Sequence, residues 1–110
     1  SFDEALAIRR RLAEQHPAAY KPNVATTLNN LGIVLCDLGE SKKARDAYHE
    51  ALTIFWDFFQ QLPRAFGDYF WGTLKRYVAI TEESDTDLWW EIYRQLGGGD
   101  RKDGPANADA

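Results

Sequence analysis

The chain repeats itself at a distance of 46 residues, and this repeat limits the possible folds more than any other feature of the sequence. A shift of 46 aligns the 32 positions from Glu4 to Leu35 with a later copy, and nine of them are identical, against about two expected by chance. The clearest block aligns residues 4–8 with 50–54, and Pro17 aligns with Pro63. A period of this length is typical of solenoids, in which one supersecondary unit stacks on the next.

Apolar residues within each repeat follow the period of a helix. Between residues 41 and 62 they recur at intervals of four and three, at Ala44, Tyr48, Ala51, Phe55, Phe58 and Leu62. This spacing places them on one face of an α-helix, and residues 24–38 and 70–81 carry the same rhythm. The pattern predicts an all-α fold. The predicted helices cover residues 3–15, 22–38, 41–62, 64–82 and 86–96.

Turn residues place boundaries between these helices. Pro22 suits the first turn of a helix, where its missing N–H costs nothing. Gly39 favours a C-terminal stop, Ser41 can cap the next helix, and Pro63 interrupts the apolar stripe after Leu62. Because the links are short, neighbouring helices are expected to run antiparallel.

Hairpins of this kind cannot bury their apolar faces alone, so they must stack. We expect a partial repeat over residues 1–21, a complete hairpin over 22–63, and a degenerate terminal hairpin over 64–96 whose last helix caps the array. The tail over 97–110 has no large apolar residue and is rich in Gly, Ala and Asp, which predicts disorder. Because the chain contains no Met, we expect it to be a piece of a longer protein.

Composition argues against several classes of protein. The formal net charge is −4 and the pI is about 5.1, whereas nucleic-acid-binding domains carry a basic face. The single cysteine, Cys36, excludes an internal disulfide and a cysteine-based zinc site. The longest apolar run covers only residues 31–36, too few to span a membrane. These features predict a cytoplasmic protein that binds neither nucleic acid nor membrane.

The sequence offers no pattern for catalysis or metal binding. His16 and His49 have no neighbouring Ser or Cys that would form a nucleophile–base pair. The acidic stretch 82–87 lacks the central Gly and the closing Glu of a calcium loop, and it is interpreted as a solvated turn with helix-capping acids. We therefore expect no catalytic residue, no metal site and no cofactor.

The complete hairpin carries a spaced pattern of large and small residues. A large residue is followed by Leu-Gly, a Gly turn comes next, and the second helix holds spaced small and aromatic residues. The pattern consists of Leu28, Leu31, Gly32, Leu35, Gly39, Ala44, Tyr48 and Ala51. It resembles the tetratricopeptide repeat family. The 46-residue period resembles the long-helix variety of kinesin-light-chain-like and bacterial signalling proteins.

This resemblance implies a right-handed superhelical stack of antiparallel helix hairpins. It also implies a non-catalytic module that binds a protein or peptide on its concave face, lined by the first helix of each repeat. The candidate partner-binding residues are Asn29, Asn30, Ile33, Asp37, Lys75 and Arg76. Some family members clamp a peptide's C-terminal carboxylate with Asn, Arg and added lysines. Here Gly72 stands where such a lysine is expected, so a generic polar groove is the preferred interpretation.

Aromatic residues gather in the second half of the chain, where 12 of the 15 lie from Phe55 onward. The candidate patch consists of Trp56, Phe59, Trp71, Trp89 and Trp90. Either the terminal helix over 86–96 docks on these aromatics and closes the array, or they form an exposed patch for a partner or a homodimer. The alternative functions are a self-association module that uses this patch, or the C-terminal sensor repeats of a larger multidomain signalling protein.

Overall fold

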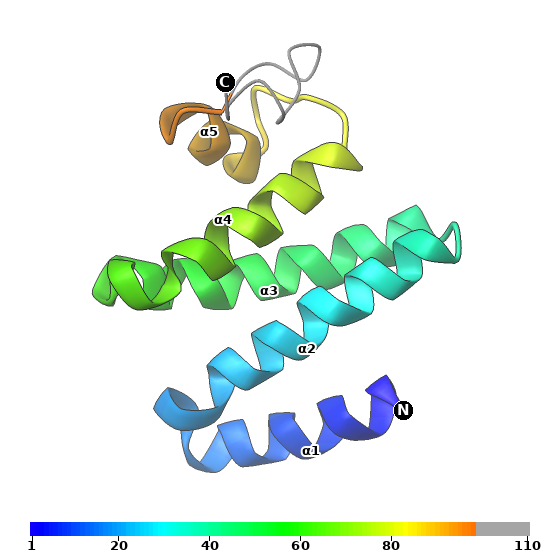
Figure 1. Cartoon of the computed structure of the whole chain (residues 1–110), viewed down its shortest axis with the longest axis vertical. Coiled ribbons are helices and arrows are strands. Elements are labelled where there is room, and N and C mark those ends of the chain that lie inside the picture. Colours follow the sequence, from blue (N-terminus) through cyan, green and yellow to red (C-terminus); the bar gives the residue numbers. More distant parts are fainter. Residues whose placement is uncertain (99–110) are drawn as a thin grey trace.

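Five α-helices build the part of the chain that the structure, a computed structural model, describes, residues 1–98. They are α1 (Phe2–Gln15), α2 (Pro17–Asp37), α3 (Ser41–Gln61), α4 (Pro63–Ala79) and α5 (Leu88–Gln95). Consecutive helices from α1 to α4 run in opposite directions and stack one above the next (Figure 1). The predicted all-α stack of hairpins is confirmed. Within residues 1–98, no helix is long and apolar enough to cross a membrane. The predicted disordered tail lies outside the described residues from residue 99 onward.

The turn between α2 and α3 is set by Gly39, as predicted. Gly39 has a φ of 77°, in the left-handed region that favours glycine. Its N–H donates to the carbonyl of Cys36, and the N–H of Glu40 donates to the carbonyl of Leu35. This pair of bonds is a Schellman motif and satisfies the last carbonyls of α2. Because the motif leads directly into the next helix, Glu40 takes the N-cap position, and the predicted cap at Ser41 is wrong.

The start of α2 lies five residues before the predicted one. Pro17 takes the first helical position, where its missing N–H costs nothing, and Pro22 lies inside the helix. Tyr20 extends the apolar stripe of Val24 and Leu28 by one interval of four, which is the sequence signal for the earlier start. The repeat boundary drawn at residue 22 therefore falls within a helix.

The closest approach of α2 and α3 is at Gly32. A Cβ atom added to Gly32 would lie 2.4 Å from the ring of Tyr48, so only glycine fits there. Tyr48 is 2% exposed, and Ala44 on the same face of α3 is fully buried. The expectation that small residues let these helices approach closely while Tyr48 fills the space around them is confirmed.

Helix α5 closes one end of the stack by packing against α4. Trp90 and Tyr93 are fully buried, and Trp89 is 5% exposed. The Tyr93 ring stacks on that of Trp71 in α4, with ring centroids 5.4 Å apart. The indole N–H of Trp90 donates to Thr81 Oγ1 at 3.0 Å, which satisfies the only polar atom that this buried side chain carries.

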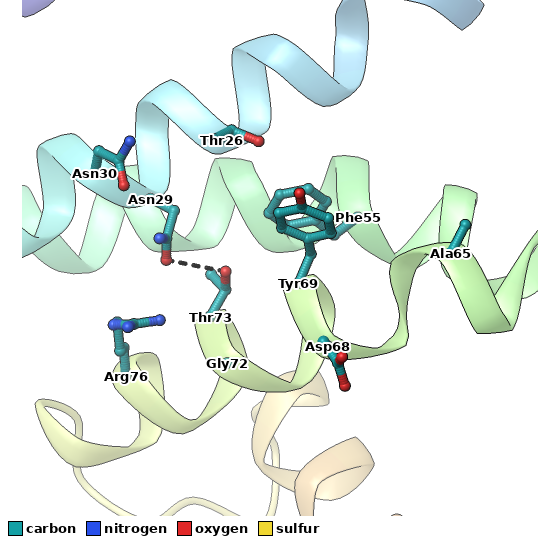
Figure 2. A pocket seen from close by; sticks show the side chains of 10 residues that line it. All are labelled: Thr26, Asn29, Asn30, Phe55, Ala65, Asp68, Tyr69, Gly72, Thr73 and Arg76. Atoms are coloured by element: carbon teal, nitrogen blue, oxygen red, sulfur yellow. Dashed lines mark hydrogen bonds between the residues drawn. The ribbon is translucent and has the colours of Figure 1, made fainter.

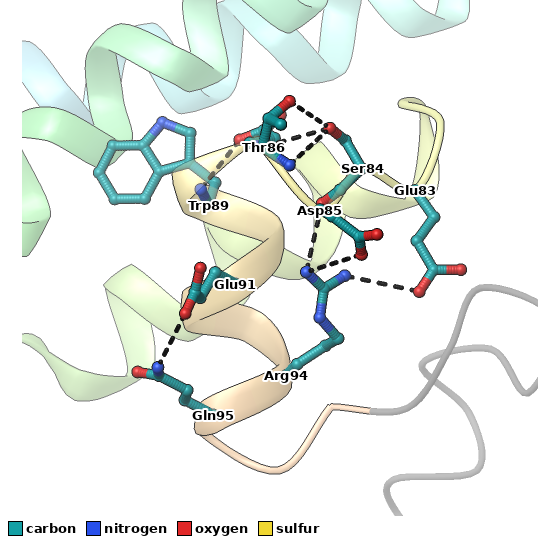
Figure 3. A network of polar contacts seen from close by, with 9 residues as sticks. Glu83, Ser84, Asp85, Thr86, Trp89, Glu91, Arg94 and Gln95 are labelled. Carbon is teal, nitrogen blue, oxygen red and sulfur yellow. Dashed lines mark hydrogen bonds and ion pairs between the residues drawn. The ribbon is translucent and has the colours of Figure 1, made fainter.

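The loop between α4 and α5 is held by polar contacts (Figure 3). Arg94 forms ion pairs with Glu83 and Asp85 at 3.5 and 3.8 Å. Asp87 caps α5 by accepting a hydrogen bond from the backbone N–H of Trp89 at 2.9 Å. The interpretation of 82–87 as a turn with a capping acid is confirmed. This cap sets the start of α5 at Leu88, later than predicted, while α4 ends at Ala79, earlier than predicted.

Candidate binding groove

A groove lies between α2 and α4, the first helices of the two hairpins. Its volume is about 440 Å³, and one residue at its base, Phe55, comes from α3. We call it the α2–α4 groove (Figure 2). Its lining consists of Thr26, Asn29, Asn30, Phe55, Ala65, Asp68, Tyr69, Gly72, Thr73 and Arg76.

The floor of the groove is fixed by a hydrogen bond between its two walls. The hydroxyl of Thr73 in α4 donates to Asn29 Oδ1 in α2 at 3.0 Å (Figure 2). Thr73 is only 1% exposed, so this bond satisfies a buried hydroxyl and ties the two helices together. Asn29 therefore acts first as a link between the walls, with its amide group at the edge of the groove.

Arg76 brings a positive charge to the groove. Its side chain is exposed and forms no ion pair within residues 1–98. Burial and a contact with Cys36 raise the pKa of Tyr48, and the charge of Arg76 acts in the opposite direction. The field of Arg76 thus reaches the base of α3. Asn30, also exposed, supplies an amide from the opposite wall.

An aromatic pair forms the other end of the groove. The Tyr69 ring stacks on that of Phe55, with centroids 5.5 Å apart and an interplanar angle of 21°. Phe55 is buried, whereas Tyr69 is 54% exposed. Asp68 lies next to Tyr69 and adds an exposed carboxylate. This end can therefore hold an apolar or cationic group, and the Arg76 end can hold an anionic one.

The structure brings together three of the six candidate partner-binding residues, namely Asn29, Asn30 and Arg76. The other three do not line the groove. Ile33 is partly buried and packs against the core, and Asp37 is exposed at the C-terminal end of α2. Lys75 is partly buried on α4. Their positions off the packing stripe of each helix are therefore not sufficient to place them in one groove.

Sequence reasoning missed Tyr69, Asp68 and the role of Phe55. A signal for Tyr69 exists, because Tyr69, Gly72 and Arg76 recur at intervals of three and four and so share one face of α4. The stacking of Tyr69 on Phe55 had no signal, because the two rings meet only when α3 and α4 pack together.

The five candidate patch residues do not form one exposed surface. Trp89 and Trp90 are buried beneath α5, so the prediction of an exposed patch is wrong for these two. Phe59 stacks on Phe70, and Trp56 contacts the same ring. Trp71 stacks on Tyr93 of α5. The arrangement agrees with the other interpretation, in which the terminal helix docks on the aromatics and closes the stack.

The remaining candidates for chemistry have structural contacts. His49, expected to be solvated, is exposed but accepts a hydrogen bond from the Trp89 indole on its Nδ1 atom at 2.8 Å. The Cys36 thiol, expected to face the groove, lies 3.8 Å from the Tyr48 hydroxyl. Among residues 1–98, no group of three His, Cys, Asp or Glu side chains is arranged to hold a metal ion.

Stacked antiparallel hairpins with a polar groove along their first helices define a helical-repeat scaffold. The family model described as tetratricopeptide repeat matches residues 1–55, half of the chain, and the chain belongs to this family. Repeats of this family are non-catalytic modules that generally mediate protein–protein interaction. Comparison with curated proteins and with solved structures gave no match.

Proposed function

We propose that the chain is a non-catalytic protein-interaction module that holds a segment of a partner protein or peptide in the α2–α4 groove. The observation that carries this proposal is the state of the polar groups in the groove. Asn30 and Arg76 are both exposed, face the groove from opposite walls, and share it with the open ring of Tyr69. Amide and guanidinium groups are suited to the carbonyl and carboxylate groups of a polypeptide.

The rigidity of the groove also supports this role. The Thr73–Asn29 hydrogen bond and the Gly32–Tyr48 contact fix the walls before a partner arrives. A preformed site loses less conformational entropy on binding than one that must order itself. The length of α2 and α3, 21 residues each, supports placing the repeat in the long-helix variety of the family.

Capture of a partner from a lysate of the source cells tests the proposal. The double variant Asn30→Ala with Arg76→Ala should lose a captured protein that the unmodified chain retains, because both polar walls lose their donors. The matched control is Asn23→Ala with Arg64→Ala, which removes the same residue types from the same helices. Asn23 and Arg64 are exposed and do not line the groove.

Circular dichroism should give the same helical signal for both double variants, because all four side chains are exposed. The proposal is wrong if the groove variant retains the partner as well as the control does. It is also wrong if both double variants lose the partner equally while remaining folded.

A further inference from the structure

The two ends of the α2–α4 groove carry opposite charges. Arg76 lies at one end, and Asp68 lies beside the ring of Tyr69 at the other. Neither charged group forms an ion pair within residues 1–98. Both are exposed, so a ligand can reach each of them without breaking an existing contact.

The guanidinium of Arg76 is drawn back along the groove by the absence of a side chain at Gly72. A Cβ atom added to Gly72 would lie 3.3 Å from Arg76 Nη1. The side chain therefore lies across the bare backbone of Gly72, toward the middle of the groove (Figure 2). A larger residue at position 72 would compete for the same space. Gly72 thus sets where the positive charge lies.

The second end offers two kinds of attraction to a cation. Phe55 covers one face of the Tyr69 ring, and the 54% exposure of Tyr69 leaves its other face open. A Lys or Arg side chain over that face gains a cation–π contact. The Asp68 carboxylate on the same turn of α4 then pairs with the same charge.

The distance between the two ends matches one step of an extended peptide. The guanidinium lies at the level of Gly72, four residues after Asp68, and a rise of 1.5 Å per residue places the two charges about 6 Å apart along the axis of α4. In an extended chain, side chains on one face are two residues apart, which is about 6.6 Å. Adjacent residues point to opposite faces and cannot reach both ends.

Resting on the function proposed above, we propose that the groove selects an extended peptide with an acidic and a basic side chain two positions apart. The acidic side chain pairs with Arg76, and the basic one lies on Tyr69 beside Asp68. The intervening residue points away from the groove. Opposite charges at this spacing, rather than net charge, determine which peptides bind.

Selection from a random peptide library tests the proposal. The unmodified chain is the bait, and the variant Gly72→Tyr, whose side chain fills the groove, removes peptides that bind elsewhere. Peptides that depend on the groove should be enriched in Glu or Asp two positions from Lys or Arg. Groove-dependent peptides without this pairing would overturn the present inference and leave the proposed function standing. Recovery of no groove-dependent peptide would overturn both.

Synthetic peptides of one length then test the pairing itself. A peptide with Glu and Lys two positions apart should bind at least about tenfold more tightly than the same composition with Glu and Lys adjacent. The variant Asp68→Lys should instead prefer a peptide with two Glu residues at that spacing, and Arg76→Glu one with two Lys residues. Equal affinity for adjacent and spaced charges, or unchanged preferences in both variants, would overturn the inference.

Discussion

Two tyrosine hydroxyls near the C-terminal end of the stack have opposite surroundings. The hydroxyl of Tyr77 donates to Asp87 at 2.6 Å, whereas the buried hydroxyl of Tyr93 has no hydrogen-bond partner among the described residues. Burial raises the pKa of both side chains, and for Tyr77 the bond to Asp87 adds to this effect. An unpaired buried hydroxyl costs about 1–3 kcal/mol. Tyr93 therefore stabilises α5 through its ring, which stacks on Trp71, and not through its hydroxyl.

Replacing each of these tyrosines by phenylalanine should separate the two roles. Tyr93→Phe should leave the free energy of unfolding unchanged or raise it by up to about 1 kcal/mol, because a buried polar atom without a partner is removed. Tyr77→Phe should lower it by about 1–2 kcal/mol, because Asp87 loses its donor. Urea unfolding followed by circular dichroism measures both. A larger loss for Tyr93→Phe than for Tyr77→Phe would contradict this account.

Two glycines inside helices differ in what a side chain would meet. A Cβ atom on Gly32 would lie 2.4 Å from the Tyr48 ring, which is held between α2 and α3 and cannot retreat. A Cβ atom on Gly67 in α4 would lie 3.6 Å from Phe59, an ordinary van der Waals distance. The first glycine is required for helix packing, and the second is not.

Alanine substitutions at these two positions should have opposite effects. Gly32→Ala should lower the free energy of unfolding by about 1–3 kcal/mol, because the added methyl group forces α2 and α3 apart. Gly67→Ala should raise it by about 0.5–1 kcal/mol, because alanine has the higher helix propensity and its methyl group fits. Thermal unfolding of the two variants measures the difference. Shifts of the melting temperature in the same direction would show that the Gly32 contact is not selective.

The helices and their order could be predicted because the signals are local. The stripe from Ala44 to Leu62 defines α3 without knowledge of any other helix, and the Gly39 turn follows from its position after α2. The start of α2 was missed because Pro17 and Pro22 are both compatible with a first helical turn, and local rules do not choose between them. Tyr20 would have favoured the earlier one.

The groove could be predicted only in part because it is formed by contacts between helices. Equivalent positions in the two repeats led to Asn30 and Arg76, which do face each other across it. The aromatic end depends on how closely α4 approaches α3, and this distance is not encoded in either helix alone. The burial of Trp89 and Trp90 depends likewise on the docking of α5.

At the scale of the whole molecule, buried tyrosines are distributed along the stack. Tyr48 lies between α2 and α3, Tyr77 in α4 and Tyr93 in α5, and burial raises the pKa of all three. In the unfolded chain a tyrosine titrates near pH 10, that is, at about 10. Because the folded-state pKa is higher, the stabilisation from these groups is fully present below about pH 10. It is lost as the pH rises toward the folded-state values.

The protein should therefore lose stability steeply above about pH 10, with a slope of at most about 1.4 kcal/mol per pH unit for each buried tyrosine. Phenolate absorbance from these tyrosines should appear together with the loss of helical circular dichroism, because they ionise only when the stack opens. Lysines also titrate in this range, so the control is Tyr48→Phe, which keeps the ring. Its stability should fall less steeply with pH than that of the unmodified chain. Equal slopes, or phenolate absorbance from all tyrosines while the helices are intact, would show that the interior does not resist ionisation.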